Sequence, residues 1–223
     1  MNILFYTPNY LPAVRYGGPI RSGHGLARAL VDAGHRVQVF TTDVDGPNRL
    51  DVPLGVPVDL DGVTVSYFPI QSPRRLYRSP AMARAVAQAL PDADVLHLNG
   101  CFLWPGPVLA ALARRAGVPY VASPRGMLQR DLISGKSPLA KRLWIRGFER
   151  DLLSCAGAIH VTSQAEAVGL ADLDLDLSPV QVVANGVEMP PDPIPESRIW
   201  QTVLRGRRVA FLGRLDWTKG VDL

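Results

Sequence analysis

The chain alternates short apolar runs of strand length with longer segments in which apolar positions recur every three or four residues. Short continuous apolar runs are typical of buried strands, and the wider spacing places apolar side chains on one face of a helix. Strands are predicted within 2–7, 34–42, 58–70, 93–100, 118–124, 156–163 and 180–187. Helices are predicted over 21–33, 79–90, 105–117, 137–154 and 163–170.

Strands that alternate with helices predict a parallel sheet covered by helices on both faces, a Rossmann-like α/β fold. The strands are continuous apolar runs, as doubly buried strands should be. Asp61 and Gly62 stand between two alternating runs and favour a hairpin. Ser163 with Glu166 three residues later indicates a capping box at a helix start.

The rhythm breaks at MPPDPIPESR, residues 189–198, where four prolines exclude regular structure. After it, RRVAFLGRLDWTKGVDL resumes the pattern of strand, loop and helix. We therefore expect one α/β domain over 1–188 and a proline-rich linker over 189–206. Residues 207–223 are expected to be the first strand and turn of a second, truncated domain.

Composition changes this picture little, because 47% apolar and 20% charged residues are ordinary for a globular protein. Cys101 and Cys155 belong to no CxxC or His/Cys cluster, which argues against a disulfide framework or a structural zinc site. The start has no basic leader, and no run of about 18 apolar residues occurs. These features favour a reducing cytoplasm. The net charge of +4 is small, and the basic residues have no aromatic residues interleaved among them that would be exposed. Neither feature indicates nucleic-acid binding.

Ligands of open α/β sheets bind beyond the carboxyl ends of the strands, so the loops there hold the candidate chemistry. Gly17 and Gly18 let the backbone approach a ligand closely, and a helix that starts near Arg21 would offer free N–H groups to an anion. The dinucleotide pattern GxGxxG is absent. An anion-binding loop and a mobile loop with glycine turns both remain open.

Two later strands also end in polar residues. His97 and Asn99 close the strand within 93–100, where they could hydrogen-bond a bound hydroxyl, although His97 could also be a core residue. Arg125 follows the next strand beside Gly126, where a fixed guanidinium could hold a phosphate or carboxylate. A structural salt bridge is the alternative for Arg125.

The last candidates lie near the end of the sequence. Arg214 and Lys219 bracket a strand-to-helix turn, which is the geometry of a diphosphate site, although a solvated surface loop would look the same. Asp43-Val44-Asp45 is the nearest approach to a metal-binding DxD motif, and a turn explains it. No metal or other cofactor is therefore expected.

Taken together, six segments resemble retaining family 4 glycosyltransferases of the GT-B fold, in the same order along the chain. They are GGPIRSGHGLARALVDAGHRVQVFT, DVLHLNG, SPRGML, HVTSQAE, VVANGV and FLGRLDWTKGVDL. The resemblance covers the whole chain and is most specific in the closing G-R-L-x-x-x-K-G and the early Gly-Gly loop. It is greatest to bacterial transferases that build exopolysaccharide or other surface glycans.

The resemblance implies two Rossmann-like domains that face each other across a cleft, with this chain forming the acceptor-side domain and the start of the donor-binding domain. It implies transfer of a sugar, with retention, from a nucleotide-diphosphate sugar to a glycan or lipid-linked acceptor. The chain alone is then expected to be inactive, because the rest of the donor domain is missing. Fixed cations would stabilise the leaving diphosphate in place of a metal.

The resemblance also implies residue roles. Arg214 and Lys219 match the pair that neutralises the donor diphosphate, and Gly18 matches the loop that meets the donor phosphate from the opposite side. Glu166 matches the glutamate of a T-S-x-x-E segment. The family usually carries H-x-H where this chain has H-L-N, so Asn99 replaces the second histidine. Asparagine can bond a sugar hydroxyl but carries no positive charge.

Basic residues are concentrated in two stretches, and we hypothesise that one of them rests on the inner face of an anionic membrane. A solvated face with its apolar stripe in the core is the alternative. Two other functions also stay open: a non-catalytic module that binds glycans or lipid-linked sugars and, less favoured by the G-R-L-x-x-x-K-G turn, a nucleotide-sugar epimerase. The first stretch contains Arg74, Arg75, Arg78 and Arg84, and the second contains Lys136, Lys141, Arg142, Arg146 and Arg150 around Leu139, Leu143, Trp144 and Phe148.

Overall fold

The structure is a computed structural model that describes residues 1–135, 137–187 and 189. The chain divides into two compact units, residues 1–187 and 188–223. Apart from Met189, the predicted linker and the predicted strand and turn over 207–223 lie outside the described residues. The account below therefore concerns the first unit.

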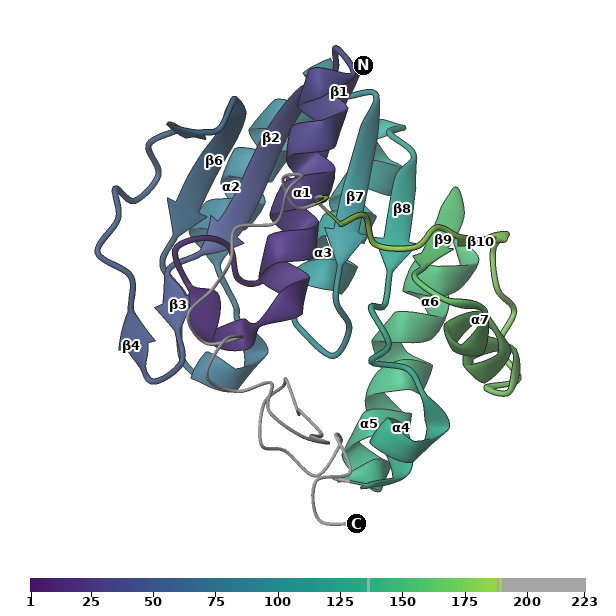
Figure 1. The fold of residues 1–223 in the computed structure, drawn as a ribbon. Coiled ribbons are helices and arrows are strands. Elements are labelled where there is room, and N and C mark those ends of the chain that lie inside the picture. The colour runs from purple at the N-terminus through teal and green to yellow at the C-terminus, as the bar shows by residue number, and fades with distance from the viewer. Residues whose placement is uncertain (136, 188, 190–223) are drawn as a thin grey trace, which may run out of the picture. The chain divides into compact units, whose positions relative to one another are not determined.

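A mainly parallel sheet of eight strands forms the centre of this unit, in the order β10-β9-β8-β7-β1-β2-β6-β5 (Figure 1). Every neighbouring pair is parallel except β5 and β6, which pair antiparallel. The strands are β1 Asn2–Tyr6, β2 Arg36–Thr42, β5 Val58–Leu60, β6 Val63–Phe68, β7 Val95–Asn99, β8 Tyr120–Ser123, β9 Ala158–Val161 and β10 Val180–Val182. A separate ladder joins β3 Val44–Asp45 to β4 Asn48–Arg49.

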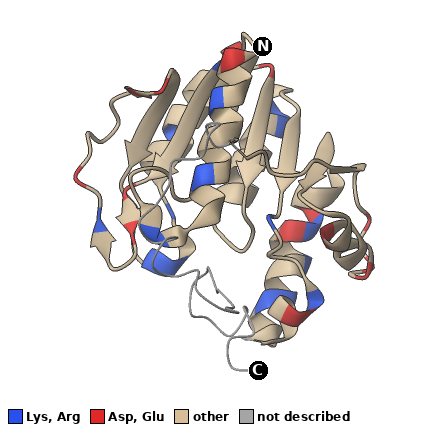
Figure 2. Cartoon of the chain, viewed as in Figure 1, with Lys and Arg blue, Asp and Glu red and all other residues tan. Residues whose placement is uncertain are grey.

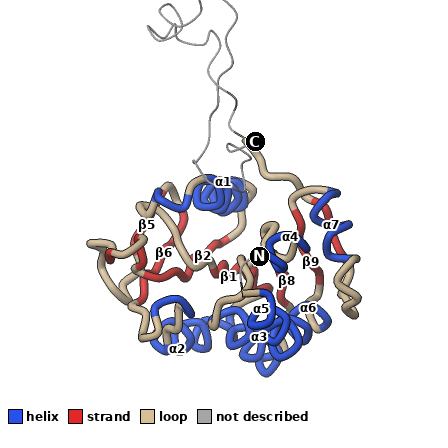
Figure 3. Tube along the Cα trace, turned by 90° about the horizontal axis from the view of Figure 1, so that it is seen from below, coloured by secondary structure: helices blue, strands red, loops and turns tan. Residues whose placement is uncertain are grey.

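Helices cover both faces of the sheet, with α1 on one side and α2, α3 and α6 on the other (Figure 3). The larger apolar cluster lies under α2, α3 and α6, and the smaller one lies under α1. The α/β fold prediction is confirmed. The helices are α1 Gly18–Asp32, α2 Pro80–Ala89, α3 Pro105–Ala116, α4 Arg130–Gly135, α5 Pro138–Trp144, α6 Arg150–Ser154 and α7 Gln164–Ala171.

The predicted hairpin is confirmed. β5 and β6 meet at Asp61 and Gly62, whose φ angles are 54° and 81°. Both residues have positive φ, as a two-residue turn of type I′ requires. The hairpin adds an antiparallel strand to the edge of an otherwise parallel sheet.

Two helix predictions need correction, and one helix was missed. The first helix begins at Gly18 rather than near Arg21, because Gly17 with φ 74° forms its N-cap and Pro19 suits a first turn. The segment 137–154 is not one α-helix, since a π-helical turn, Ile145–Glu149, separates α5 from α6. That turn places Ile145 and Glu149 in the core while residues 146–148 are exposed. The short helix α4 was not predicted.

None of the helices within the described ranges combines the length and apolar character that crossing a membrane requires.

Candidate functional site

A group of polar side chains lies where β7 and β8 end, on the face of the sheet that α1 covers. His97 and Asn99 are two residues apart on β7, so they point to the same face. This is the face that α1 covers, because Phe5, the partner of His97 on β1, belongs to the apolar cluster under α1. The segment that follows β10 crosses this part of the sheet.

His97 is held by contacts on three sides. Its ring stacks on Phe5 with centroids 4.9 Å apart, and its Nε2 lies 3.4 Å from Nδ1 of His160. The amide nitrogen of Asn99 donates to His97 Nδ1 at 3.2 Å. Burial, with smaller contributions from the nearby His160 and Arg125, lowers the pKa of His97 to about 3. His97 is therefore neutral near pH 7, with Nδ1 as an acceptor.

Asn99 connects His97 to the next strand. Its Nδ2 also donates to the carbonyl of Tyr6 at 3.2 Å, and its Oδ1 accepts from Nε of Arg125 at 3.0 Å. Asn99 is almost fully buried, with 6% of its surface exposed. Both ends of the amide are thus engaged, and in this conformation Asn99 fixes the position of the Arg125 guanidinium.

Arg125 follows β8 in a strained backbone conformation. Its φ is 55°, which is uncommon for a residue with a side chain. Nη1 donates to Oδ1 of Asn185 at 2.7 Å, so two asparagines orient the guanidinium. Burial lowers the pKa of Arg125 from its ordinary value. Among the described residues Arg125 forms no ion pair, so the salt bridge weighed above is not formed there.

Glu166 holds the loop that carries Arg125. Its Oε1 accepts from the N–H of Gly126, and its Oε2 accepts from the N–H and the hydroxyl of Thr162 at 2.8 and 3.0 Å. Ser163 Oγ accepts from the N–H of Glu166, so the first half of the predicted capping box is formed. The second half is corrected: the carboxylate bonds Thr162, one residue before the N-cap, because it also reaches Gly126.

Gly17, Gly18 and Arg21 lie at the same edge of the sheet, since α1 follows β1. Gly17 has φ 74° and ψ −142°, and Gly18 is the first residue of α1. The free N–H group of the helix start belongs to Gly18, because Pro19 has no N–H and the N–H of Ile20 donates to the carbonyl of Gly17 at 3.3 Å. The hydroxyl of Tyr16 accepts from the N–H of Gly46 at 2.7 Å, which ties this loop to the turn between β3 and β4. Arg21 is exposed in the first turn.

Arg214 and Lys219, the predicted diphosphate pair, lie outside the described residues. Within the described ranges, no three His, Cys, Asp or Glu side chains gather closely enough to hold a metal ion.

Sequence reasoning missed three residues of this group. Ser123 ends β8, His160 is the last residue but one of β9, and Ser123 Oγ lies 3.5 Å from His160 Nδ1. His160 Nε2 lies 3.0 Å from the carbonyl of Val183, and Asn185 bonds Arg125 as described above. The rule that finds His97, a polar residue near a strand's carboxyl end, would also have found His160. In the sequence, Asn185 stands before Gly186, and this pair indicated only a turn.

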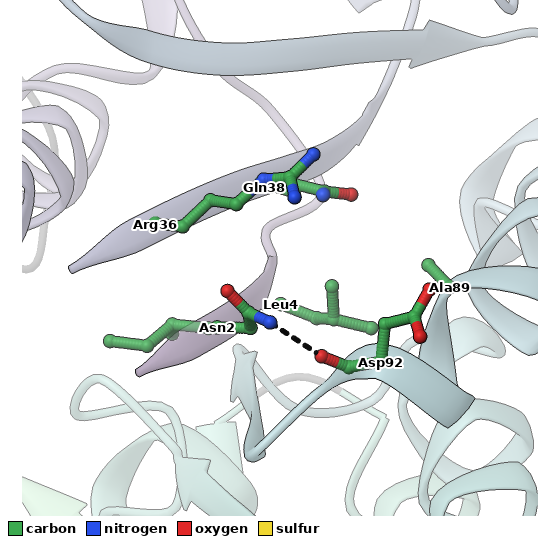
Figure 4. Close-up of a pocket in the computed structure, with 7 residues that line it drawn as sticks. Asn2, Leu4, Arg36, Gln38, Ala89 and Asp92 are labelled. Carbon is green, nitrogen blue, oxygen red and sulfur yellow. Dashed lines mark hydrogen bonds between the residues drawn. The ribbon is translucent and has the colours of Figure 1, made fainter.

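A pocket of about 170 Å³ lies at the opposite edge of the sheet, near the amino-terminal ends of β1 and β2 (Figure 4). Asn2, Arg36 and Gln38 line it from these strands, and Asn2 Nδ2 donates to the carbonyl of Asp92 at 2.8 Å. It contains none of the residues of the group above.

The fold resembles that of known glycosyltransferases. A sucrose-phosphate synthase from Thermosynechococcus elongatus matches with a TM-score of 0.59 and 14% identity, over 83% of this chain and 48% of the solved one. Alr3699/HepE of Anabaena, solved in complex with UDP-glucose, matches with a TM-score of 0.54 and 18% identity, over 84% of this chain and 44% of the solved one. At these identities the likeness shows the fold.

A curated relative is the UDP-N-acetylglucosamine–N-acetylmuramyl-(pentapeptide) pyrophosphoryl-undecaprenol N-acetylglucosamine transferase of Acidovorax ebreus. It is 36% identical over 104 residues, which are 44% of this chain and 26% of the relative. The chain thus matches about a quarter of the curated relative and about half of the solved proteins. The family model described as a glycosyl transferase 4-like domain matches residues 17–186, most of the chain. The chain therefore belongs to the glycosyl transferase 4-like domain family.

Proposed function

We propose that the protein transfers a sugar from a nucleotide-diphosphate sugar to a glycan or lipid-linked acceptor, with retention of configuration, in the synthesis of a surface polysaccharide. The observation that carries this proposal is the strained, doubly anchored Arg125 beside Asn99 at the carboxyl edge of the sheet, in a chain of this family. In α/β sheets that edge is where ligands bind.

The described residues suit the acceptor side of such a reaction. A guanidinium has five N–H donors, and two of those of Arg125 bond Asn99 and Asn185. The remaining donors can hold a hydroxyl or an anionic group of the acceptor in a fixed orientation. The neutral His97 accepts from Asn99 and so helps to orient it without adding charge.

The donor side of the proposal rests on fixed positive charge. Breaking the bond from the sugar C1 to the diphosphate leaves negative charge that must be stabilised. We assign this role to Arg214 and Lys219, with Gly17 and Gly18 at the start of α1 facing the donor phosphate. No metal is then needed. Alr3699/HepE binds UDP-glucose, and the Acidovorax relative is named for an undecaprenol-linked acceptor, which supports a UDP-sugar donor and a lipid-linked acceptor here.

The test uses the complete encoded protein with radiolabelled UDP-glucose or UDP-N-acetylglucosamine and a lipid extract of its source cells. Label should enter the lipid, EDTA should not reduce the rate, and NMR of the product should show the donor's anomeric configuration. Arg125→Ala should lower kcat/KM about 10- to 100-fold, since hydrogen bonds to charged groups are worth about 1.5–3 kcal/mol. Arg115→Ala, an exposed change on α3, should leave the rate unchanged.

Each part of the proposal can fail separately. An inverted product would contradict retention, and a loss of rate with EDTA would contradict the metal-free mechanism. Saturable binding of glycan or lipid-linked sugar without any transfer would favour the non-catalytic binding module instead.

We also propose that the protein is cytoplasmic and rests peripherally on an anionic membrane through α5. The structure distinguishes the two basic stretches, because Arg74 of the first donates to the carbonyls of Gly46 and Asn48 and is held within the fold. In the second, Leu139 and Leu143 are 75% and 71% exposed beside exposed arginines. Figure 2 shows Lys and Arg positions along this segment. Exposed leucines beside arginines suit a headgroup region.

Sedimentation with phosphatidylglycerol vesicles at low salt tests this surface. The protein should sediment with the vesicles, and Leu139→Glu with Leu143→Glu should release it. Val168→Glu on α7, where the valine is 54% exposed, is the matched control and should sediment normally. Equal sedimentation of both variants, or none of the wild type, would reject α5 as the membrane surface.

A further inference from the structure

A groove of about 240 Å³ lies between α2 and α3, apart from the polar group described above. Its floor is apolar and its rim is basic. In the chain α2 follows β6 and α3 follows β7, so the first turns of both helices lie toward the carboxyl edge of the sheet. The floor includes Met82, Ala83, Trp104 and Val108, and the rim includes Arg78 and Arg84.

The polar groups of the groove leave only the arginines for a ligand. Ser79 is buried, and its hydroxyl donates to the carbonyl of Pro69 at 2.8 Å while accepting from the N–H of Met82. Arg78 and Arg84 are exposed, and neither guanidinium has a hydrogen-bond or ion-pair partner among the described residues. No acidic residue occurs between residues 71 and 90 to neutralise them.

Trp104 extends the apolar floor toward α5. Its ring lies 6.3 Å from that of Trp144 and 5.7 Å from that of Phe148, and the latter two rings are 4.7 Å apart. Phe148 is 37% exposed. A cluster of three aromatic rings therefore connects the wall of the groove with the helical segment that we propose for membrane contact.

We infer that this groove binds the hydrocarbon chain of an anionic lipid phosphate, with the phosphate at Arg78 and Arg84. The inference rests on the proposed lipid-linked acceptor and names where its chain lies. An apolar floor takes a chain and excludes a free anion, while the basic rim selects a charged headgroup over a neutral one. Trp104 lies five residues after Asn99 in the loop that follows β7, so the groove and the polar group lie at the same edge of the sheet, on opposite faces.

The test titrates the protein with dodecyl phosphate, below its micelle concentration, in a calorimeter. We expect saturable binding that inorganic phosphate does not reproduce. Val108→Glu places a charge on the apolar floor and should weaken binding more than about tenfold, because an unpaired buried charge is costly. Arg84→Glu replaces a positive charge of the rim with a negative one and should also weaken the binding of dodecyl phosphate.

Arg115→Glu is the control matched to Arg84→Glu, since it makes the same change of charge at an exposed site farther along α3, outside the groove. It should bind like the wild type, and circular dichroism melting should show that all variants fold. Equal binding by Val108→Glu, or equal affinity for inorganic phosphate, would overturn the inference. If Val108→Glu still transfers sugar to a lipid-linked acceptor with unchanged KM, the groove assignment fails while the proposed function stands. If the wild type binds dodecyl phosphate but transfers no sugar, the groove assignment stands and the proposed function is rejected.

Discussion

Glu149 is a buried carboxylate in which only one oxygen is bonded to the protein. Oε1 accepts from the N–H of Phe102 at 2.7 Å and from the indole N–H of Trp144 at 2.9 Å. Oε2 is buried with no partner among the described residues. Burial raises the pKa of Glu149 above its ordinary value, against the opposing effect of these hydrogen bonds. Its negative charge therefore costs stability that its hydrogen bonds offset only in part.

Glu149→Gln should become more favourable, relative to the wild type, as pH rises. A carboxyl whose pKa is raised on folding stabilises the fold below its unfolded pKa of about 4.3, and that contribution is lost as pH rises through the folded pKa. Glutamine keeps an acceptor for Phe102 and Trp144 but does not titrate. Urea unfolding between pH 4.5 and pH 8 measures the difference, and a difference that is constant or falls with pH would contradict the raised pKa.

Glu166→Gln is the natural contrast, because both oxygens of Glu166 accept hydrogen bonds from Thr162 and Gly126. The amide NH2 cannot accept, so one set of buried donors loses its partner. We expect a loss of about 1–3 kcal/mol in the free energy of unfolding. Unchanged stability in urea would show that these bonds are not made in solution.

At this scale the sequence shows which residues are candidates but not what they bond. Strand-end polarity identified His97, Asn99 and Arg125 as separate candidates. Their mutual hydrogen bonds depend on the pairing of β7 with β8, which no local pattern reveals. Glu149 stands among Arg, Gly and Phe in a segment that reads as a solvated helix face, so its burial could not be predicted.

Among the elements, α1 depends on one glycine of an adjacent pair. Gly17 has φ 74°, whereas Gly18 is not among the residues with positive φ, and a Cβ at either position would meet no atom within 4 Å. Gly17→Ala should therefore destabilise the fold by about 1–3 kcal/mol through backbone strain alone, because a residue with a Cβ rarely adopts φ 74° with ψ −142°.

Gly18→Ala supplies the control and should be neutral or stabilise by up to about 1 kcal/mol. Thermal unfolding of both variants under one condition measures the contrast. Similar melting temperatures for the two would show that the loop does not keep the positive φ at Gly17.

Element predictions succeeded where one signal dominated and failed where two competed. Asp61-Gly62 specified the hairpin because few other sequences favour positive φ at both positions. The start of α1 was placed too late because the glycines suggested a loop, although Pro19 fits a first turn. The π turn was missed because helical periodicity continues through it, and only the burial of Glu149 reveals the extra residue.

For the whole molecule, residues 1–187 hold a complete sheet and both apolar clusters. We expect this segment, made alone, to fold cooperatively, with a circular dichroism spectrum of mixed α/β type and a single thermal transition. A broad, non-cooperative melt would show that the sheet needs the residues after 187. The sequence predicted the parallel sheet, but strand order depends on contacts between distant segments.

The π turn has a consequence for how relatives are compared with this chain. In an α-helix each residue is rotated by about 100° about the helix axis from the residue before it. One residue fewer between Trp144 and Arg150 would therefore rotate α5 by that angle relative to α6. A relative without the extra residue would align with a single gap there. Its counterparts of Leu139 and Leu143 would face a different direction, even if every other position matched.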